Sequence, residues 1–67
     1  MIINKVKEFR VNLNLTQVEL AKIVNVSSRT IISIEAQKYN PTLELAFKLA
    51  EALDTTILEL FEFKGEE

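Results

Sequence analysis

The sequence predicts an all-α fold of five short helices in a single domain spanning residues 1–67. Three observations predict it. The chain has room for only one small hydrophobic core, and apolar residues recur with a helical period along most of it. A single glycine and a single proline leave few chain breaks. With 48% hydrophobic and 27% charged residues, the composition is that of a globular protein and argues against disorder.

The first two helices follow from spacing and from capping residues. Residues 4–13 are expected to form the first helix, because apolar residues recur there at intervals of three and four. The second begins after Thr16, which can form a capping box with Glu19. It ends near Asn25, a residue type that tolerates the left-handed conformation.

A third helix follows after a very short connection. Ser27 can cap it, and it is expected to reach about Ala36. Only residues 25–27 separate it from the second helix, and this spacing predicts a helix-turn-helix unit over residues 16–36. On a helical wheel, Ile31, Ile34 and Glu35 fall on one side, and Arg29, Ile32, Ser33 and Ala36 fall on the other.

The remaining segments predict two more helices and a ribbon. A fourth helix is expected after Thr42, and its inner face is Ala46, Leu49, Ala50 and Leu53. A second capping box, Thr56 with Glu59, predicts a short fifth helix over residues 57–61. The β-prone ends "MII" and "FEFK" are expected to pair as a small two-stranded antiparallel ribbon.

The outer face of the third helix suggests binding to double-stranded DNA. The face is short-chained and nearly uncharged, whereas a merely solvated face more often carries lysine and glutamate. The major groove admits such a helix, and residues near the helix N-terminus read the bases. Arginine can donate two hydrogen bonds to guanine, serine can donate or accept, and isoleucine can contact a thymine methyl group. The candidate base-reading residues are Ser28, Arg29, Ile32 and Ser33.

Composition excludes several other functions. Without cysteine or histidine, the chain offers no usual zinc site, no thiolate and no imidazole base, so an enzyme, a metal site and a cofactor are not expected. No small-molecule ligand is evident, and no run is long enough to span a membrane. The N-terminus does not resemble a signal peptide, so a cytoplasmic location is expected.

Charge gives two opposing indications about a nucleic-acid partner. The net charge of −2 disfavours a nucleic-acid partner. Residues 1–40 nevertheless carry six basic against three acidic residues, and residues 41–67 carry two basic against seven acidic. Binding is therefore expected in the first half of the chain.

The stretch "LTQVELAKIVNVSSRTIISIEAQKYNP" resembles the Cro/CI-type (XRE) helix-turn-helix family of DNA-binding transcriptional regulators, whose fold is the five-helix lambda-repressor-like domain. The match is ungapped. Length, the "MIIN" start and "KYNPTLELAFKLA" resemble the short cytolysin-repressor-type members, which are homodimers with a terminal ribbon. The matching residues are Leu15, Thr16, Gln17, Glu19, Leu20, Ala21, Val26, Ser27, Thr30, Ile31, Ile34, Glu35, Lys38 and Pro41.

The resemblance implies roles for individual residues. Gln17 would contact phosphate and brace the recognition helix, and an ion pair between Arg10 and Glu35 would tie the first helix to the third. The caps Thr16 and Ser27 stand where helix N-termini would face phosphate. Backbone contacts after the third helix would come from Lys38, Tyr39 and Asn40.

Some residues depart from the family pattern. Gln37 replaces the glycine that usually ends the third helix, so it is either strained by roughly 1 kcal/mol or lies in a longer helix. Ala36 replaces a polar residue often used on phosphate. The family is usually polar at the positions of Val11, Val18, Ile23 and Leu58.

The expected function is a sequence-specific regulator, most simply a repressor, acting as a homodimer on an inverted-repeat operator. The dimer interface is expected in a tail at about residues 57–64, from Leu58, Phe61 and Phe63, although Phe61 is equally suited to the core. The surplus apolar residues and the acidic balance leave a second function open, that of an antitoxin-like or adaptor protein that binds other proteins.

Overall fold

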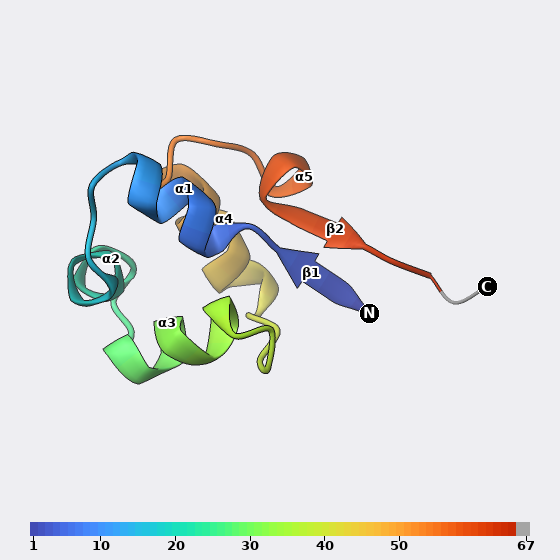
Figure 1. Cartoon of the computed structure of the whole chain (residues 1–67), viewed down its shortest axis with the longest axis horizontal. Coiled ribbons are helices and arrows are strands. Elements are labelled where there is room, and N and C mark those ends of the chain that lie inside the picture. Colours follow the sequence, from blue (N-terminus) through green and yellow to red (C-terminus); the bar gives the residue numbers. More distant parts are fainter. Residues whose placement is uncertain (66–67) are drawn as a thin grey trace.

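The computed structural model describes residues 1–65 and contains five helices and two short strands (Figure 1). The strand β1 comes first and β2 comes last, so the helices lie between two segments that pair with each other. The elements are β1 (Ile2–Asn4), α1 (Val6–Asn12), α2 (Gln17–Val24), α3 (Ser28–Glu35), α4 (Leu43–Ala52), α5 (Ile57–Leu60) and β2 (Phe61–Phe63).

One hydrophobic core joins all five helices. The apolar residues of the inner faces predicted for α3 and α4 are buried, including both isoleucines assigned to the inner side of α3. Phe9, Leu15, Val26, Ile57 and Phe61 pack around the core as partly buried side chains. The buried apolar residues of the core are Val6, Leu20, Ala21, Val24, Ile31, Ile34, Leu45, Leu49, Ala50, Leu53 and Leu60.

The four predicted N-caps are present, and each hydroxyl oxygen accepts a backbone N–H from three residues later. Thr16 and Glu19 form the complete capping box: the Thr16 hydroxyl accepts the Glu19 N–H at 3.0 Å, and Glu19 accepts the Thr16 N–H at 2.8 Å. The second capping box was only half right. Glu59 accepts the Thr55 hydroxyl at 2.9 Å, so its carboxylate does not return to the backbone of Thr56.

The first four helices all end on a left-handed residue other than glycine. At the end of α3 the Gln37 N–H donates to the Ile34 carbonyl and the Lys38 N–H donates to the Ser33 carbonyl, each at 3.0 Å. This is the Schellman arrangement, which pairs the last free carbonyls of a helix. The same two bonds recur after α1, α2 and α4. The left-handed residues are Asn14, Asn25, Gln37 and Asp54, with φ between 57° and 64°.

The predicted ribbon is confirmed: β1 pairs antiparallel with β2, with Ile2 opposite Phe63 and Asn4 opposite Phe61. It extends away from the helices, and the N-terminus lies at its far end (Figure 1). Three predicted boundaries were wrong. The first helix begins at Val6 because Asn4 belongs to the strand, and it ends at Asn12, one residue before the predicted end. The fifth helix ends at Leu60 because the backbone at Phe61 is extended.

Over residues 1–65, no helix is both long enough and apolar enough to cross a membrane.

Candidate nucleic-acid interface

A tight turn sets α3 against α2. Asn25 takes the left-handed conformation, with φ 61°, and the Val26 N–H donates to the Ala21 carbonyl at 2.9 Å. Val26 is half-buried against the core, and the small Ala21 is buried where the two helices meet. The turn therefore fixes one helix-turn-helix geometry through backbone bonds and one apolar side chain.

The helix α3 presents two different faces. Ile31 and Ile34 are fully buried, so the opposite side of the helix faces solvent. On that side Arg29 is exposed and Ile32 is 49% exposed, while Ser28 and Ser33 are half-buried. The four predicted base-reading residues therefore share one accessible side of α3.

Residues predicted to read bases and residues predicted to hold the DNA backbone meet in one shallow hollow. Arg29 and Ser33 come from α3, Ser27 from its cap, and Lys38 and Tyr39 from the loop that follows. Asn40 is exposed in the same loop but does not line the hollow. Within residues 1–65 neither Arg29 nor Lys38 forms an ion pair, so both charges are available to a partner.

Thr30 lines the same hollow and was not among the predicted site residues. Its hydroxyl lies 3.0 Å from that of Ser27, and the two share a hydrogen bond. Its position three residues after a serine cap is the signal that could have identified it, because capping places these two residues side by side. Ser27 and Thr30 form a hydroxyl pair at the N-terminal end of α3.

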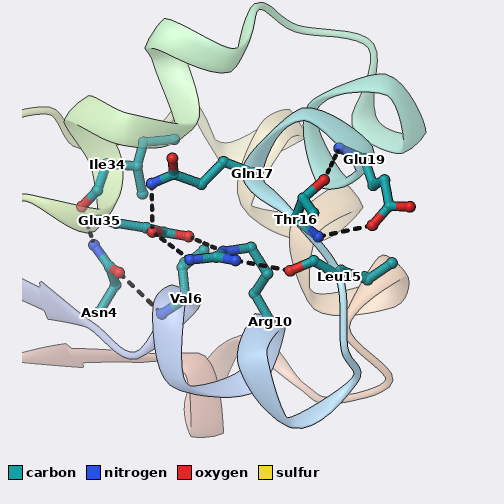
Figure 2. A network of polar contacts seen from close by, with 9 residues as sticks. All are labelled: Asn4, Val6, Arg10, Leu15, Thr16, Gln17, Glu19, Ile34 and Glu35. Carbon is teal, nitrogen blue, oxygen red and sulfur yellow. Dashed lines mark hydrogen bonds and ion pairs between the residues drawn. The ribbon is translucent and has the colours of Figure 1, made fainter.

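A polar network anchors α3 from its buried side (Figure 2). The Arg10 side chain donates to both Glu35 carboxylate oxygens, from Nε at 2.6 Å and from Nη2 at 3.2 Å, so the expected ion pair is present. Arg10 also donates to the Leu15 carbonyl at 2.7 Å. Gln17 donates from Nε2 to Glu35 at 3.0 Å and thus braces α3 from the first residue of α2.

The two helix starts of this unit lie at residues 16–17 and 27–28, and the first N–H groups of a helix have no partner within it. At α2, the capping box occupies the N–H groups of Thr16 and Glu19. At α3, the Ser27 hydroxyl accepts the Thr30 N–H at 3.2 Å. The remaining first-turn N–H groups are the ones suited to a phosphate oxygen.

Sequence reasoning missed the role of Asn4 and only half anticipated that of Gln37. Two conformations were expected for Gln37, a strained left-handed one or a place in a longer helix, and the structure shows the left-handed one. Its side-chain amide also forms hydrogen bonds with Asn4. Asn4 is a buried polar residue at 8% exposure. The two lie 33 residues apart in sequence, so no local pattern connects them.

The residues proposed for dimerisation divide into two groups. Leu58 is 90% exposed and Phe63 is 75% exposed, so both are accessible to a second chain. Phe61 packs against the core, as the alternative interpretation of this residue expected. Leu43 and Phe47 on α4 are also exposed, although the helical period gave no reason to single them out.

Comparison with known proteins defines the class. A model of the Helix-turn-helix family HTH_3 matches residues 6–60, which is most of the chain. The chain belongs to this helix-turn-helix family, which is the XRE-type family that the sequence resembles. Together with its relatives it is a transcriptional regulator with a helix-turn-helix DNA-binding fold, and not an enzyme.

Two similar relatives are archaeal. An HTH-type transcriptional regulator of Archaeoglobus fulgidus is 48% identical over 63 residues, which cover 94% of this chain and 89% of the relative. Another from Methanocaldococcus jannaschii is 47% identical over 64 residues, covering 96% of this chain and 97% of the relative. Both alignments therefore include nearly the whole of each protein.

Solved structures share the fold. A putative DNA-binding protein from Bacteroides fragilis superposes with a TM-score of 0.84 and 27% identity, covering 92% of this chain and all of that one. The restriction-modification controller protein C.AhdI from Aeromonas hydrophila superposes with a TM-score of 0.76 and 30% identity, covering 81% and 82% of the two chains. The five-helix Cro/CI-like architecture predicted from the sequence is confirmed.

Proposed function

We propose that this regulator binds double-stranded DNA in a sequence-specific way, with α3 in the major groove, and acts as a homodimeric repressor on an inverted-repeat operator. The observation that carries the proposal is the accessible outer face of α3. It combines one exposed arginine, two serines and one exposed isoleucine with a neighbouring basic loop. In this function the chain works where the chromosome lies, in the cytoplasm.

Each residue on this face has a specific partner in the groove. Arg29, in the first turn of α3, can donate two hydrogen bonds to the O6 and N7 atoms of guanine. Ser28 and Ser33 can donate to or accept from several base edges, and Ile32 can contact a thymine methyl group. The two serines have short side chains, so they let the helix enter the groove deeply.

Groups on both sides of α3 are placed to hold the DNA backbone. Lys38, Tyr39 and Asn40 follow α3 in the exposed loop, and Thr16, Gln17 and Ser27 stand at the two helix starts. Such contacts set the register of the protein on the duplex and carry no sequence information themselves. Because Gln17 also donates to Glu35, a phosphate contact at Gln17 would be transmitted directly to α3.

A homodimer would supply the DNA-binding affinity that a single recognition helix cannot. A good base contact contributes only about 1–3 kcal/mol of discrimination. Two copies related by a two-fold axis would place two α3 helices about 34 Å apart, one turn of the duplex. The tail at residues 57–64 offers Leu58 and Phe63 for this contact.

Selection of bound duplexes from a random pool tests the proposal. An inverted repeat is expected, and binding should weaken by about 0.9 log units per log unit of salt for each phosphate contacted. Arg29→Ala should relax the preference at one position of each half-site, whereas Lys38→Ala should weaken binding to all duplexes alike. An unchanged preferred sequence in Arg29→Ala would show that Arg29 does not read a base.

A second candidate function, binding to another protein, rests on exposed apolar side chains outside these surfaces. Val11, Val18 and Ile23 are each more than half exposed, and their positions are usually polar in the family that the sequence resembles. A protein-interaction module of this kind would show no salt-dependent affinity for duplex DNA. Measuring how duplex binding changes with salt concentration therefore separates the two functions.

A further inference from the structure

We propose that Gln37 is a positioning residue for operator binding: its side-chain amide joins the end of α3 to β1 and thereby sets the half-site spacing that the dimer accepts. This inference rests on the proposed function. It concerns the orientation of α3 relative to the ribbon and the tail, and not the bases that α3 reads.

The backbone at Gln37 gives the first reason to look for a role. Its φ is 64°, in the left-handed region that disfavours residues with a side chain by about 1–2 kcal/mol. The other three left-handed helix ends carry asparagine or aspartate, which visit this region more readily. Glutamine has no such advantage, so its side chain needs an interaction that offsets the strain.

That interaction is a pair of hydrogen bonds to the backbone of one strand residue. Gln37 Oε1 accepts the Asn4 N–H at 3.1 Å, and Gln37 Nε2 donates to the Asn4 carbonyl at 3.0 Å. The two bonds reproduce one rung of a β-ladder, with the glutamine amide in place of a peptide group. On its other side β1 pairs with β2, so Gln37 occupies the edge of β1 that faces away from β2.

The two hydrogen bonds between Gln37 and Asn4 form a joint between α3 and β1, and the Asn4 side chain extends this joint in two directions. Its Nδ2 donates to the Ile34 carbonyl of α3 at 2.9 Å and to Gln37 Oε1 at 3.2 Å. Its Oδ1 accepts the Val6 N–H at the start of α1 at 3.0 Å (Figure 2). All the polar groups of Asn4 are thus engaged, and three elements meet at one buried residue. A group satisfied so completely holds a single geometry.

The joint lies on the route between the proposed dimer interface and the proposed reading helix. Phe63 stands on β2 opposite Ile2, two residues from Asn4 on β1. Glu35 is held by Arg10 and Gln17, which fix α3 from α1 and α2. Gln37 adds two hydrogen bonds between the end of α3 and the ribbon to the one that Asn4 Nδ2 makes with the Ile34 carbonyl. Without the Gln37 bonds, α3 keeps its place in the helical body, but a single hydrogen bond is left to hold the ribbon against α3, and the ribbon can tilt.

The test compares Gln37→Gly with Asn25→Gly, a matched replacement at the left-handed end of α2. Gln37→Gly relieves the strained φ while it removes the amide, and Asn25 makes no side-chain hydrogen bond within residues 1–65. Affinity is measured for the selected duplex and for duplexes with one base pair added or removed between the half-sites. One base pair moves and rotates one half-site relative to the other, so a rigid dimer discriminates between these duplexes.

Wild type and Asn25→Gly should bind the selected spacing at least about tenfold more tightly than the altered ones. Gln37→Gly should bind all three within roughly threefold, with the half-site sequence preference unchanged. Gln37→Glu serves as a second variant of similar shape, because its carboxylate cannot donate to the Asn4 carbonyl, and it should lose the discrimination too. A Gln37→Gly protein that keeps the wild-type spacing ratio overturns the inference.

Hydrogen exchange at the Asn4 amide separates the two proposals. Exchange should be faster in Gln37→Gly than in Asn25→Gly, and equal rates in both would overturn the joint itself. If the wild type binds DNA but shows no spacing preference, the inference fails and the dimeric operator fails with it. If the wild type does not bind duplexes at all, the proposed function fails, and the spacing role of Gln37 is overturned even where the exchange result shows the joint.

Discussion

At the scale of single residues, a buried carboxylate on α3 depends on two partners. The Glu35 side chain is only 4% exposed and that of Arg10 only 11%. Arg10 also satisfies the Leu15 carbonyl, and Gln17 satisfies one Glu35 oxygen. Removal of either charge would leave the other in a poorly hydrated site, and this penalty is larger than the net gain from the pair itself.

Arg10→Ala is therefore expected to lower the free energy of unfolding by about 3–5 kcal/mol. Urea titration followed by circular dichroism measures this loss. Lys48→Ala is the matched control, because Lys48 pairs with Glu44 at 3.4 Å on an exposed helix face and should contribute less than about 0.5 kcal/mol. Equal losses in the two variants would show that burial does not strengthen the dependence on Arg10.

Individual contacts were predictable only where a family pattern or a short spacing points to them. The Arg10–Glu35 pair followed from the resemblance, and the Thr16–Glu19 box followed from its three-residue spacing. The bonds between Asn4 and Gln37 followed from neither, because polar residues far apart in sequence meet only after the helices have packed. The sequence marked Gln37 as unusual, and the structure supplies the partner.

At the scale of elements, helix starts were easier to predict than helix ends. The hydroxyl residues at positions 16, 27, 42 and 56 all cap helices, because a cap is a local interaction. The fifth helix is one residue shorter than expected, since pairing of Phe61 with Asn4 competes with helix formation. Strand pairing is non-local, and a spacing rule cannot weigh it against a helical turn.

The left-handed ends give a prediction that belongs to this scale. Asn25→Ala should lower the free energy of unfolding by about 1 kcal/mol, because an alanine at φ 61° is strained, whereas Asn25→Gly should not lower it. Thermal unfolding of the two variants measures the difference. A glycine variant as unstable as the alanine variant would mean that the asparagine side chain, rather than the backbone conformation, holds the turn between α2 and α3.

At the scale of the whole molecule, large apolar side chains remain exposed on several separate elements. The ribbon and α5 carry Phe63 and Leu58, and α2 carries Ile23, which is also exposed. The all-helical body and the terminal ribbon were both predictable, because each leaves a periodic pattern in the sequence. A partner chain leaves only exposed apolar residues, which a single sequence cannot assign to one interface.

Leu58→Ser tests which surface joins two copies. Leu58 is 90% exposed, so the change removes almost no contact within its own chain. Burial of a leucine in an interface contributes about 1.5–3 kcal/mol, and two-fold symmetry counts it twice. The dissociation constant of the dimer should therefore rise by about 100-fold or more, as measured by sedimentation equilibrium.

Ile23→Ser is the control for that experiment, since it removes an exposed apolar side chain from α2 without touching the proposed tail interface. It should leave the association unchanged. If Leu58→Ser associates as tightly as wild type, Leu58 lies outside the contact, and Phe63 on β2 becomes the next residue to change. If Phe63→Ser is also without effect, the contact lies outside the tail, and the spacing role of Gln37 fails with it, because that role requires a dimer joined through the tail.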